Sequence, residues 1–313
     1  MKGRGAWLLR ALGLGLFIWL IGRADWSEFS RVFAELDAPL LFILPVLTAI
    51  MIGLRAWRWN LLLAVREQAL PLGRAWGIYA IGLFLGSVTP GRLGDLAKAW
   101  YVRGEGQVDW DQALAGALTD RLFDVAFMAV LAVWALFQLE LKGLWSGGGM
   151  VLYMVSGLGF ALFFATDWRR WLQQRRAFAF LVGLKDEVVH LVRGAGPGAA
   201  LLTLLGFAVY FTQTVLLARA LGLMLAPGDV VAAIVLVGLA AFLPISVAGF
   251  GTREGLLALV FAHRAVPNSL EMALAYSGLF FGFCFAVPAL MGFACWLKNP
   301  LSLAELKAGT ARP

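Results

Sequence analysis

Six segments of the chain are each mainly apolar over about 20 residues, the length that a helix needs to cross a bilayer. They are residues 6–22, 38–54, 120–138, 149–166, 199–219 and 272–297. Hydrophobic residues make up 61% of the 313 residues and charged residues only 14%, whereas soluble domains contain about 25% charged residues. A soluble globule could not bury so much apolar surface. The sequence therefore predicts an all-α polytopic membrane protein and excludes a cytosolic enzyme or a secreted disulfide scaffold.

The charge and the reactive side chains add little chemistry of their own. A net charge of +7 is typical of membrane proteins, which carry Lys and Arg on cytoplasmic loops, so no nucleic acid partner is expected. The cysteines, Cys284 and Cys295, share the last apolar segment, and the histidines, His190 and His263, lie in separate segments. We therefore expect no metal and no cofactor.

Two further apolar segments, residues 75–103 and 230–263, are interrupted by glycine and proline. The first is broken at residues 87–92, and the second is broken at Pro244 and again at residues 249–254. A helix over 75–88 would be about 21 Å long, shorter than the roughly 30 Å hydrocarbon core. Each segment is predicted to be a re-entrant hairpin.

The distribution of basic residues favours this topology. Residues 6–22 are predicted to be a retained first span rather than a cleaved signal, because no small-x-small site follows them. With the N-terminus inside, eighteen of the 26 Lys and Arg residues fall on the cytoplasmic side, five outside and three in the hairpins. Six spans plus two hairpins, with both termini cytoplasmic, satisfy the positive-inside rule.

This topology predicts a single membrane domain, residues 1–313, made of two inverted repeats. The first repeat is 1–138 and the second is 149–297, each with one interrupted segment at the matching position. Such repeats are typical of carriers with a site at the bilayer midplane. The alternative is that glycine and proline are simply common in membrane helices. Residues 167–198 are predicted to be an amphipathic helix on the cytoplasmic surface, because large apolar and basic residues alternate there.

The first hairpin tip has the composition of an anion site. Thr89 suits an N-cap, Pro90 the first helical position, and Gly91 a close approach of ligand to backbone. Arg92 follows within one turn, and phosphate is the natural guest of an arginine at a helix N-terminus. Asp95 can pair with Arg92 when the site is empty, and Lys98 continues the basic side.

The second tip repeats this composition in a different order. Gly249 and Gly251 supply flexibility, Thr252 can cap a helix, and Arg253 and Glu254 begin the returning arm. A charge at bilayer depth costs about 2.5–3.5 kcal/mol, so charges at a broken helix indicate a purpose. They either bind substrate or only pair with each other and lock the hairpin.

Two other clusters are candidates for a gate or a proton site. Asp120, Arg121 and Asp124 stand at the start of a predicted span, where the acids either complement the helix dipole or take up a proton. Arg55 and Arg58 end the second predicted span among tryptophans. They act either as snorkelling interfacial residues or as a gate for a headgroup.

Together these motifs resemble a known family of integral membrane proteins. The run Thr89–Asp95, the pair Asp120–Arg121, Pro244 and the run Gly249–Gly255 are similar to motifs of the lysylphosphatidylglycerol synthase transmembrane family, whose members are flippase-like. Residues 55–59 resemble its Arg-rich motif with tryptophan, and Asp95 departs from it because the family usually has Glu. The resemblance spans roughly residues 10–300 and covers the membrane part only, so no aminoacyl-transfer activity is expected.

The resemblance implies a non-enzymatic protein of the bacterial inner membrane that flips or scrambles a phosphate-bearing lipid. The headgroup is expected to bind at the two hairpin tips, including Pro244. Two alternatives stay open. One is a membrane enzyme acting on a lipid phosphate, for which Asp120 and Asp124 are the candidate carboxylates. The other is a scaffold that holds a separate lipid-modifying enzyme as its partner.

Overall fold

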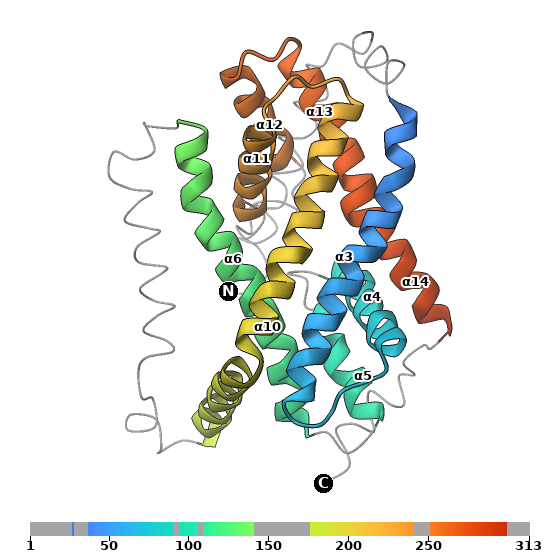
Figure 1. Cartoon of the computed structure of the whole chain (residues 1–313), viewed down its shortest axis with the longest axis vertical. Helices are drawn as coiled ribbons and strands as arrows, with labels where there is room; N and C mark the ends of the chain where they lie inside the picture. The colour runs from blue at the N-terminus through green and yellow to red at the C-terminus, as the bar shows by residue number, and fades with distance from the viewer. Residues whose placement is uncertain are drawn as a thin grey trace, which may run out of the picture. The chain divides into compact units, whose positions relative to one another are not determined.

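The computed structural model consists of helices and the turns that join them in the residues that it describes, which are 27, 37–89, 94–105, 109–140, 176–240 and 251–298. A π-helical turn, Gly282–Ala286, joins the last two helices. The helices labelled in Figure 1 are α3 (Ala38–Ala64), α4 (Leu72–Val88), α5 (Ala97–Glu105), α6 (Trp110–Gln138), α10 (Arg176–Ala220), α11 (Pro227–Ala240), α12 (Thr252–His263), α13 (Ser269–Phe281) and α14 (Val287–Lys298). The predicted spans 6–22 and 149–166 lie outside the described residues.

Three stretches of the described helices are long and apolar enough to cross a membrane. They are Phe42–Ala64, Val182–Ala220 and Ser269–Lys298. These stretches contain most or all of the predicted spans 38–54, 199–219 and 272–297. Large apolar side chains on them are exposed, as expected for helices whose solvent is lipid. The chain is thus an α-helical membrane protein, as predicted, while the number of crossings stays a prediction.

Both predicted hairpin segments consist of two helices separated by a break. The first break lies between α4 and α5, and the second lies between α11 and α12. With 17 residues, α4 is about 26 Å long, which is shorter than the hydrocarbon core. The described residues thus contain a helix end at Thr89 and a helix start after Gly251, at the predicted breaks 87–92 and 249–254, whereas the predicted break at Pro244 lies outside the described residues. That each pair enters and leaves on one side of the membrane remains a prediction.

Several predicted boundaries differ from the observed ones. Helix α3 continues to Ala64, ten residues beyond the predicted end, and α6 begins at Trp110, ten residues before the predicted start. Helix α10 runs for 45 residues with Pro197 inside it, so the described part of the predicted surface helix 167–198 continues directly into the span 199–219. At about 68 Å, α10 is longer than a whole bilayer of about 40–45 Å.

The chain divides into two compact units, and each takes residues from both halves of the sequence. Unit 1 is 1–49, 128–142 and 208–287, and unit 2 is 50–127, 143–207 and 288–313. Within unit 1, helices α11, α12 and α13 lie next to one another (Figure 1). Within unit 2, α4 lies against α5. The predicted repeats 1–138 and 149–297 stay a prediction.

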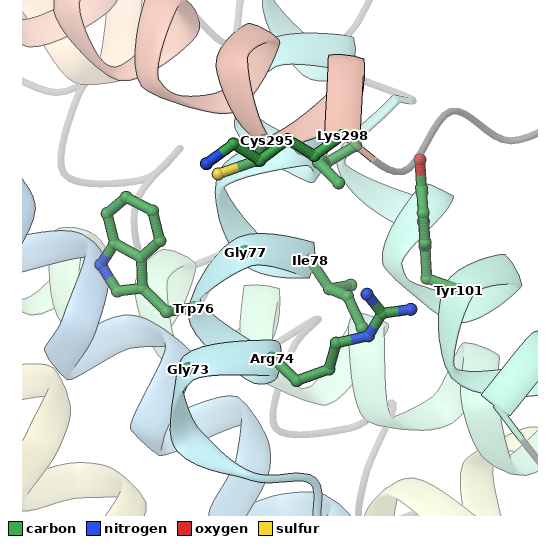
Figure 2. Close-up of a pocket in the computed structure, with 9 residues that line it drawn as sticks. Gly73, Arg74, Trp76, Gly77, Ile78, Tyr101, Cys295 and Lys298 are labelled. Atoms are coloured by element: carbon green, nitrogen blue, oxygen red, sulfur yellow. The ribbon is translucent and has the colours of Figure 1, made fainter.

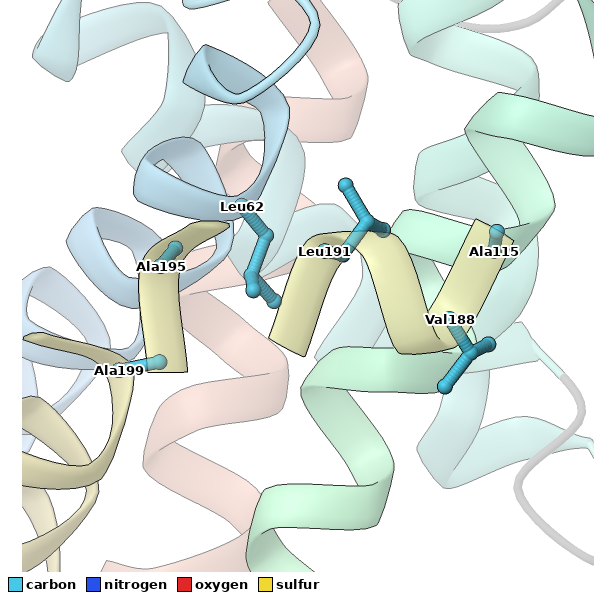
Figure 3. Close-up of a cluster of buried hydrophobic side chains, with 6 residues drawn as sticks. All are labelled: Leu62, Ala115, Val188, Leu191, Ala195 and Ala199. Carbon is cyan, nitrogen blue, oxygen red and sulfur yellow. The ribbon is translucent and has the colours of Figure 1, made fainter. Parts of the chain in front are cut away.

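A hydrophobic cluster joins α3, α6 and α10 within unit 2. Leu62 of α3 packs against the face of α10 that carries Val188, Leu191, Ala195 and Ala199, and Ala115 of α6 completes the cluster (Figure 3). The α10 residues are spaced by three or four, so they share one face. Small residues on that face let the helices approach closely, which brings the polar side chains of these helices within reach of one another.

The topology can be tested at two exposed turns, after both native cysteines are replaced by alanine. Glu67 lies in the turn after α3, and Met224, which is fully exposed, lies in the turn after α10. Six spans plus two hairpins place Glu67 inside and Met224 outside. In intact cells, an impermeant maleimide should label Met224→Cys and should label Glu67→Cys only after permeabilisation. The reverse pattern would overturn the hairpin topology.

Candidate functional site

Asp120 is the centre of a buried network of charged side chains in unit 2. Its side chain has no exposed surface, and it accepts hydrogen bonds from three helices. Arg58 Nε of α3 lies 2.8 Å from Oδ1, and Lys98 Nζ of α5 lies 2.5 Å from Oδ2. The hydroxyl of Tyr79 in α4 lies 3.2 Å from Oδ2. Asp120, itself in α6, therefore connects four helices through one carboxylate.

Arg58 extends the network to a second carboxylate and a fifth helix. Its Nη1 donates to Asp124 Oδ1 at 2.7 Å and to the hydroxyl of Thr203 in α10 at 2.9 Å. Asp124 lies one turn after Asp120 on α6, so one guanidinium spans both acids. The fixed fork of an arginine suits such bridging, which a lysine cannot reproduce.

A third carboxylate, that of Asp95, lies just before α5. Asp95 is buried and pairs with Arg121 of α6, whose Nη1 also lies 3.6 Å from Asp124 Oδ2. A Cβ atom at Gly86 of α4 would collide with the carboxylate of Asp95, so glycine leaves the room that this carboxylate occupies. The network thus holds equal numbers of cations and carboxylates, namely Arg58, Lys98 and Arg121 with Asp95, Asp120 and Asp124.

Aromatic rings surround the ammonium group of Lys98. Its Nζ lies 4.4 Å from the ring centroid of Tyr79 and 5.6 Å from that of Trp59. A cation over an aromatic face gains about 2 kcal/mol when it is desolvated. The rings and Asp120 together compensate Lys98 for the loss of water.

This arrangement provides donors for an anion and acceptors for a proton or cation. Arg58 Nη2 is buried and makes no hydrogen bond to the described residues. Guanidinium and ammonium groups are the usual protein ligands of phosphate. A carboxylate released from such a cation can bind a proton or a cationic group.

Two sequence-based interpretations are wrong for this network. Arg58 does not snorkel, because it is fully buried and bonded to two acids. Of the two tryptophans beside it, Trp57, which is 52% exposed, fits an interfacial position, whereas Trp59 is buried. Asp120 and Asp124 do not complement a helix dipole, because α6 begins at Trp110 and the dipole acts within the first turn. Arg55 is near enough to Asp124 for its positive charge to act on that carboxylate, and its Cζ lies 5.3 Å from the ring centroid of Phe207.

At the first hairpin tip, Thr89 connects the two sides of the break. It is the C-cap of α4, and its hydroxyl donates to the carbonyl of Leu85 at 2.8 Å and accepts the N–H of Gly94 at 2.7 Å. Thr89 thus ends α4 and also accepts a hydrogen bond from the backbone on the other side of the break. Pro90, Gly91 and Arg92 lie outside the described residues.

At the second tip, Gly251 is the N-cap of α12, in place of Thr252, which is the first helical residue. Its φ of 83° is a backbone conformation that favours glycine. Its N–H donates to Glu254 Oε2 at 2.6 Å, so Glu254 satisfies an orphan donor of the helix start. Pro244 and Gly249 lie outside the described residues.

Arg253 and Glu254 make the contacts of an internal lock within unit 1. Arg253 Nη2 lies 2.8 Å from Glu254 Oε1, and Arg253 Nε donates to the hydroxyl of Ser277 in α13 at 2.5 Å. That hydroxyl also donates to Glu254. The rings of Phe280 and Phe281 lie 5.8 and 5.7 Å from Arg253 Cζ. Substrate binding by Arg253 stays a prediction.

The sequence analysis missed several members of these networks. Tyr79, Thr203 and Ser277 are single polar residues inside apolar helices, where hydroxyls are common, so no sequence signal distinguishes them. Lys98 had a signal, because a lysine inside an apolar segment usually has a partner. Its pairing with Asp120 needed the three-dimensional structure.

The buried network should contribute more to stability than an exposed ion pair does. Arg58→Gln leaves two buried carboxylates short of a donor, and breaking a buried pair costs about 3–5 kcal/mol. We expect the midpoint of thermal unfolding in detergent to fall by about 5–10 °C. Arg66 pairs with Glu187 at 2.6 Å with a side chain that is 37% exposed, so Arg66→Gln is the matched control and should change the midpoint little. Equal shifts would contradict the assignment.

The comparisons with known proteins identify the family of the chain. The family model described as the lysylphosphatidylglycerol synthase TM region matches residues 7–292. No curated protein and no solved structure matches the chain. The matched region includes all six charged residues of the buried network and both hairpin segments. With nearly its whole length matched, the chain belongs to the lysylphosphatidylglycerol synthase transmembrane-region family.

Proposed function

We propose that this protein flips or scrambles a phosphate-bearing lipid, or a lipid-linked intermediate, across the bacterial inner membrane. Its family ties the chain to a membrane role in lipid metabolism. The observation that carries the proposal is the buried network of Arg58, Lys98 and Asp120. Charges are rarely kept in spanning segments without a role in a substrate or ion pathway. The network supports a role in which a charged headgroup is handled away from water.

In the proposed cycle, the lipid phosphate takes the place of a carboxylate on the basic side chains. Arg58 Nη2 is the first donor offered, because it makes no bond to the described residues. Lys98 is the second, since it already shares Asp120 with Arg58. An incoming phosphodiester adds one negative charge to a neutral cluster. Proton uptake by Asp120 or Asp124 would restore the balance.

The hairpin tips are part of the same proposal. Arg92 and Arg253 are expected to contact the phosphate, while Asp95 and Glu254 hold the arginines when no lipid is bound. The lock formed by Arg253, Glu254 and Ser277 supports the second half of this expectation. Opening that lock would release one guanidinium for a headgroup. Hairpins that open to opposite sides would give alternating access.

A vesicle assay tests the proposal directly. Purified protein is reconstituted into liposomes that carry fluorescent phosphatidylglycerol, and dithionite then bleaches only the outer leaflet. We expect protein-containing vesicles to lose nearly all fluorescence, whereas protein-free vesicles lose about half. Arg58→Lys keeps the charge but loses the fork that bridges two acids, so it should slow the movement at least tenfold. Arg66→Lys is the matched surface control and should leave the rate unchanged.

A second pair of variants distinguishes the loss of a specific contact from misfolding. Thr203→Val removes one contact of Arg58 without changing side-chain shape, and it should slow movement severalfold. Thr212→Val on the same helix removes a hydroxyl that is exposed and bonds to Ala208, so it should have no effect. Equal movement of a fluorescent diacylglycerol would contradict headgroup recognition. Absence of lipid movement by the folded wild type would reject translocation. Chemical conversion of the lipid in that case would favour the membrane-enzyme alternative. Absence of both movement and conversion would favour the scaffold alternative.

A further inference from the structure

An uncharged polar cluster in unit 1 joins the three stretches that are long and apolar enough to cross a membrane. Leu44 and Thr48 belong to α3, Gln213 belongs to α10, and Phe283 belongs to the π-helical turn before α14. Leu44 and Gln213 have no exposed surface, and Thr48 is 1% exposed. The polar groups of this cluster are therefore out of contact with water and lipid headgroups.

The cavity in unit 2 does not offer a comparable set of groups. It has a volume of about 180 Å³ and lies among α4, Tyr101 of α5 and the end of α14 (Figure 2). Its lining is mainly apolar, and the charged ends of Arg74 and Lys298 point to different sides of it (Figure 2). Its polar groups do not converge on one ligand, whereas those of the unit 1 cluster do.

The amide of Gln213 connects the members of this cluster. Its Nε2 donates to the hydroxyl of Thr48 at 2.7 Å and to the carbonyl of Leu44 at 2.9 Å. The Thr48 hydroxyl oxygen in turn lies 2.9 Å from the carbonyl oxygen of Leu44 and 3.4 Å from that of Phe283. A hydroxyl carries a single proton, so Thr48 satisfies only one of these two carbonyls at a time.

The carbonyl of Phe283 lacks the donor that a regular helix would supply. The N–H of Val287, four residues later, bonds instead to the carbonyl of Gly282. A π-helical turn pairs a carbonyl with the N–H five residues later, but that residue is Pro288, which has no N–H. The 3.4 Å contact with Thr48 is long for a hydrogen bond between two oxygens. This carbonyl is therefore short of a donor inside an apolar helix.

A second oxygen of the cluster is also short of a donor. Gln213 Oε1 is buried and makes no hydrogen bond to the described residues. Leaving a buried polar atom unsatisfied costs about 1–3 kcal/mol. The cluster thus holds more oxygen acceptors than its own donors can satisfy, and it requires a positive partner.

An excess of uncharged oxygens suits a monovalent metal cation. Hard cations prefer oxygen ligands, and backbone carbonyls freed at interrupted helices bind sodium in transporters. The cluster itself contains no carboxylate, so the second charge of a divalent ion would stay uncompensated in the membrane.

The positions of the oxygens allow them to share one ion. Rotation of the Gln213 amide by half a turn exchanges Nε2 with Oε1, and this terminal torsion is soft. Two oxygens at a right angle around an ion, each about 2.4 Å from it, are about 3.4 Å apart. The oxygens of Thr48 and Phe283 have this separation. That of Leu44, 2.9 Å from Thr48 Oγ1, reaches it with a small shift.

We propose that this cluster binds a monovalent metal cation of the size of sodium. Its ligands are Thr48 Oγ1, Gln213 Oε1 and the carbonyl oxygens of Leu44 and Phe283. The ion takes the place that the amide nitrogen of Gln213 holds, and it satisfies the two oxygens that lack a donor. It also joins α3 and α10 to the π-helical turn. The site is separate from the charge network and does not depend on lipid movement.

Thermal unfolding of the full chain in detergent tests this site, with sodium chloride compared with choline chloride at equal ionic strength. Saturating sodium should raise the midpoint by at least about 3 °C. Thr48→Val and Gln213→Leu each remove one ligand and should lose this rise. Thr212→Val removes a neighbouring exposed hydroxyl that bonds to Ala208, so it should keep the rise. An equal rise in choline, or in all variants, would overturn the proposal.

Two further variants separate loss of the site from misfolding. Pro288→Ala removes no ligand but offers Phe283 the N–H that it lacks, so it should weaken sodium binding at least tenfold. Pro197→Ala changes a proline within α10 and is the matched control, with binding as in the wild type. Thr48→Ser keeps the hydroxyl and should also bind sodium. Unchanged binding by Pro288→Ala would contradict the role assigned to Phe283.

Equilibrium binding of radioactive sodium to the same proteins measures the ion directly. We expect one sodium ion per wild-type chain, displaced by unlabelled sodium but not by magnesium. Equal displacement by magnesium would contradict a monovalent site. If the wild type binds no sodium, the cluster provides hydrogen bonds between helices only, and the proposal is wrong. Because the measurement needs no lipid movement, its failure is distinguishable from failure of translocation.

Discussion

A carboxylate without access to water requires a positive charge beside it, and Asp120 meets this requirement with groups from three other helices. Arg58 and Lys98 neutralise it, while Tyr79 adds a hydrogen bond. Loss of one partner leaves a buried charge, whose cost far exceeds that of an ordinary hydrogen bond. Asp120 therefore contributes to the relative placement of α3, α4, α5 and α6 in unit 2. The broken segment α4–α5 is held to its neighbours by polar contacts in addition to apolar packing.

Unit 1 also compensates a buried carboxylate, and it does so with the same kinds of group. Glu254 is paired with Arg253, a hydroxyl of Ser277 joins them, and aromatic rings lie beside the cation. In unit 2 the corresponding parts are Asp120, Lys98, Tyr79 and Trp59. Each set lies next to an interrupted helical segment that begins with a short helix. Both units thus place a neutral ion cluster beside a broken helix. Pairing of opposite charges lowers the free-energy cost of keeping them inside a membrane.

Sequence reasoning predicted the helical class and the helix boundaries near residues 89 and 251, because apolar length and glycine–proline breaks are local properties. It also singled out most of the charged residues that the structure brings together. It failed where distant residues decide the outcome. Arg58 was expected near the membrane–water interface, yet its ion pairs with the two acids on α6 hold it in the protein interior. The boundaries of α3 and α6 shifted for the same reason, since paired charges let a helix continue through residues that would otherwise end an apolar segment. Pairing partners such as Lys98 with Asp120 leave no trace in a single sequence.

The equal number of cations and carboxylates in the cluster has a consequence for energetics. Moving one elementary charge through a membrane potential of 100 mV involves about 2.3 kcal/mol. In the proposed translocation, an anionic headgroup that crosses together with one proton carries no net charge, so its passage between the two faces is electroneutral. Voltage alone then neither drives nor opposes the movement, whereas a difference in proton concentration does. A zwitterionic headgroup needs no proton, so the same cluster would carry it passively in either direction.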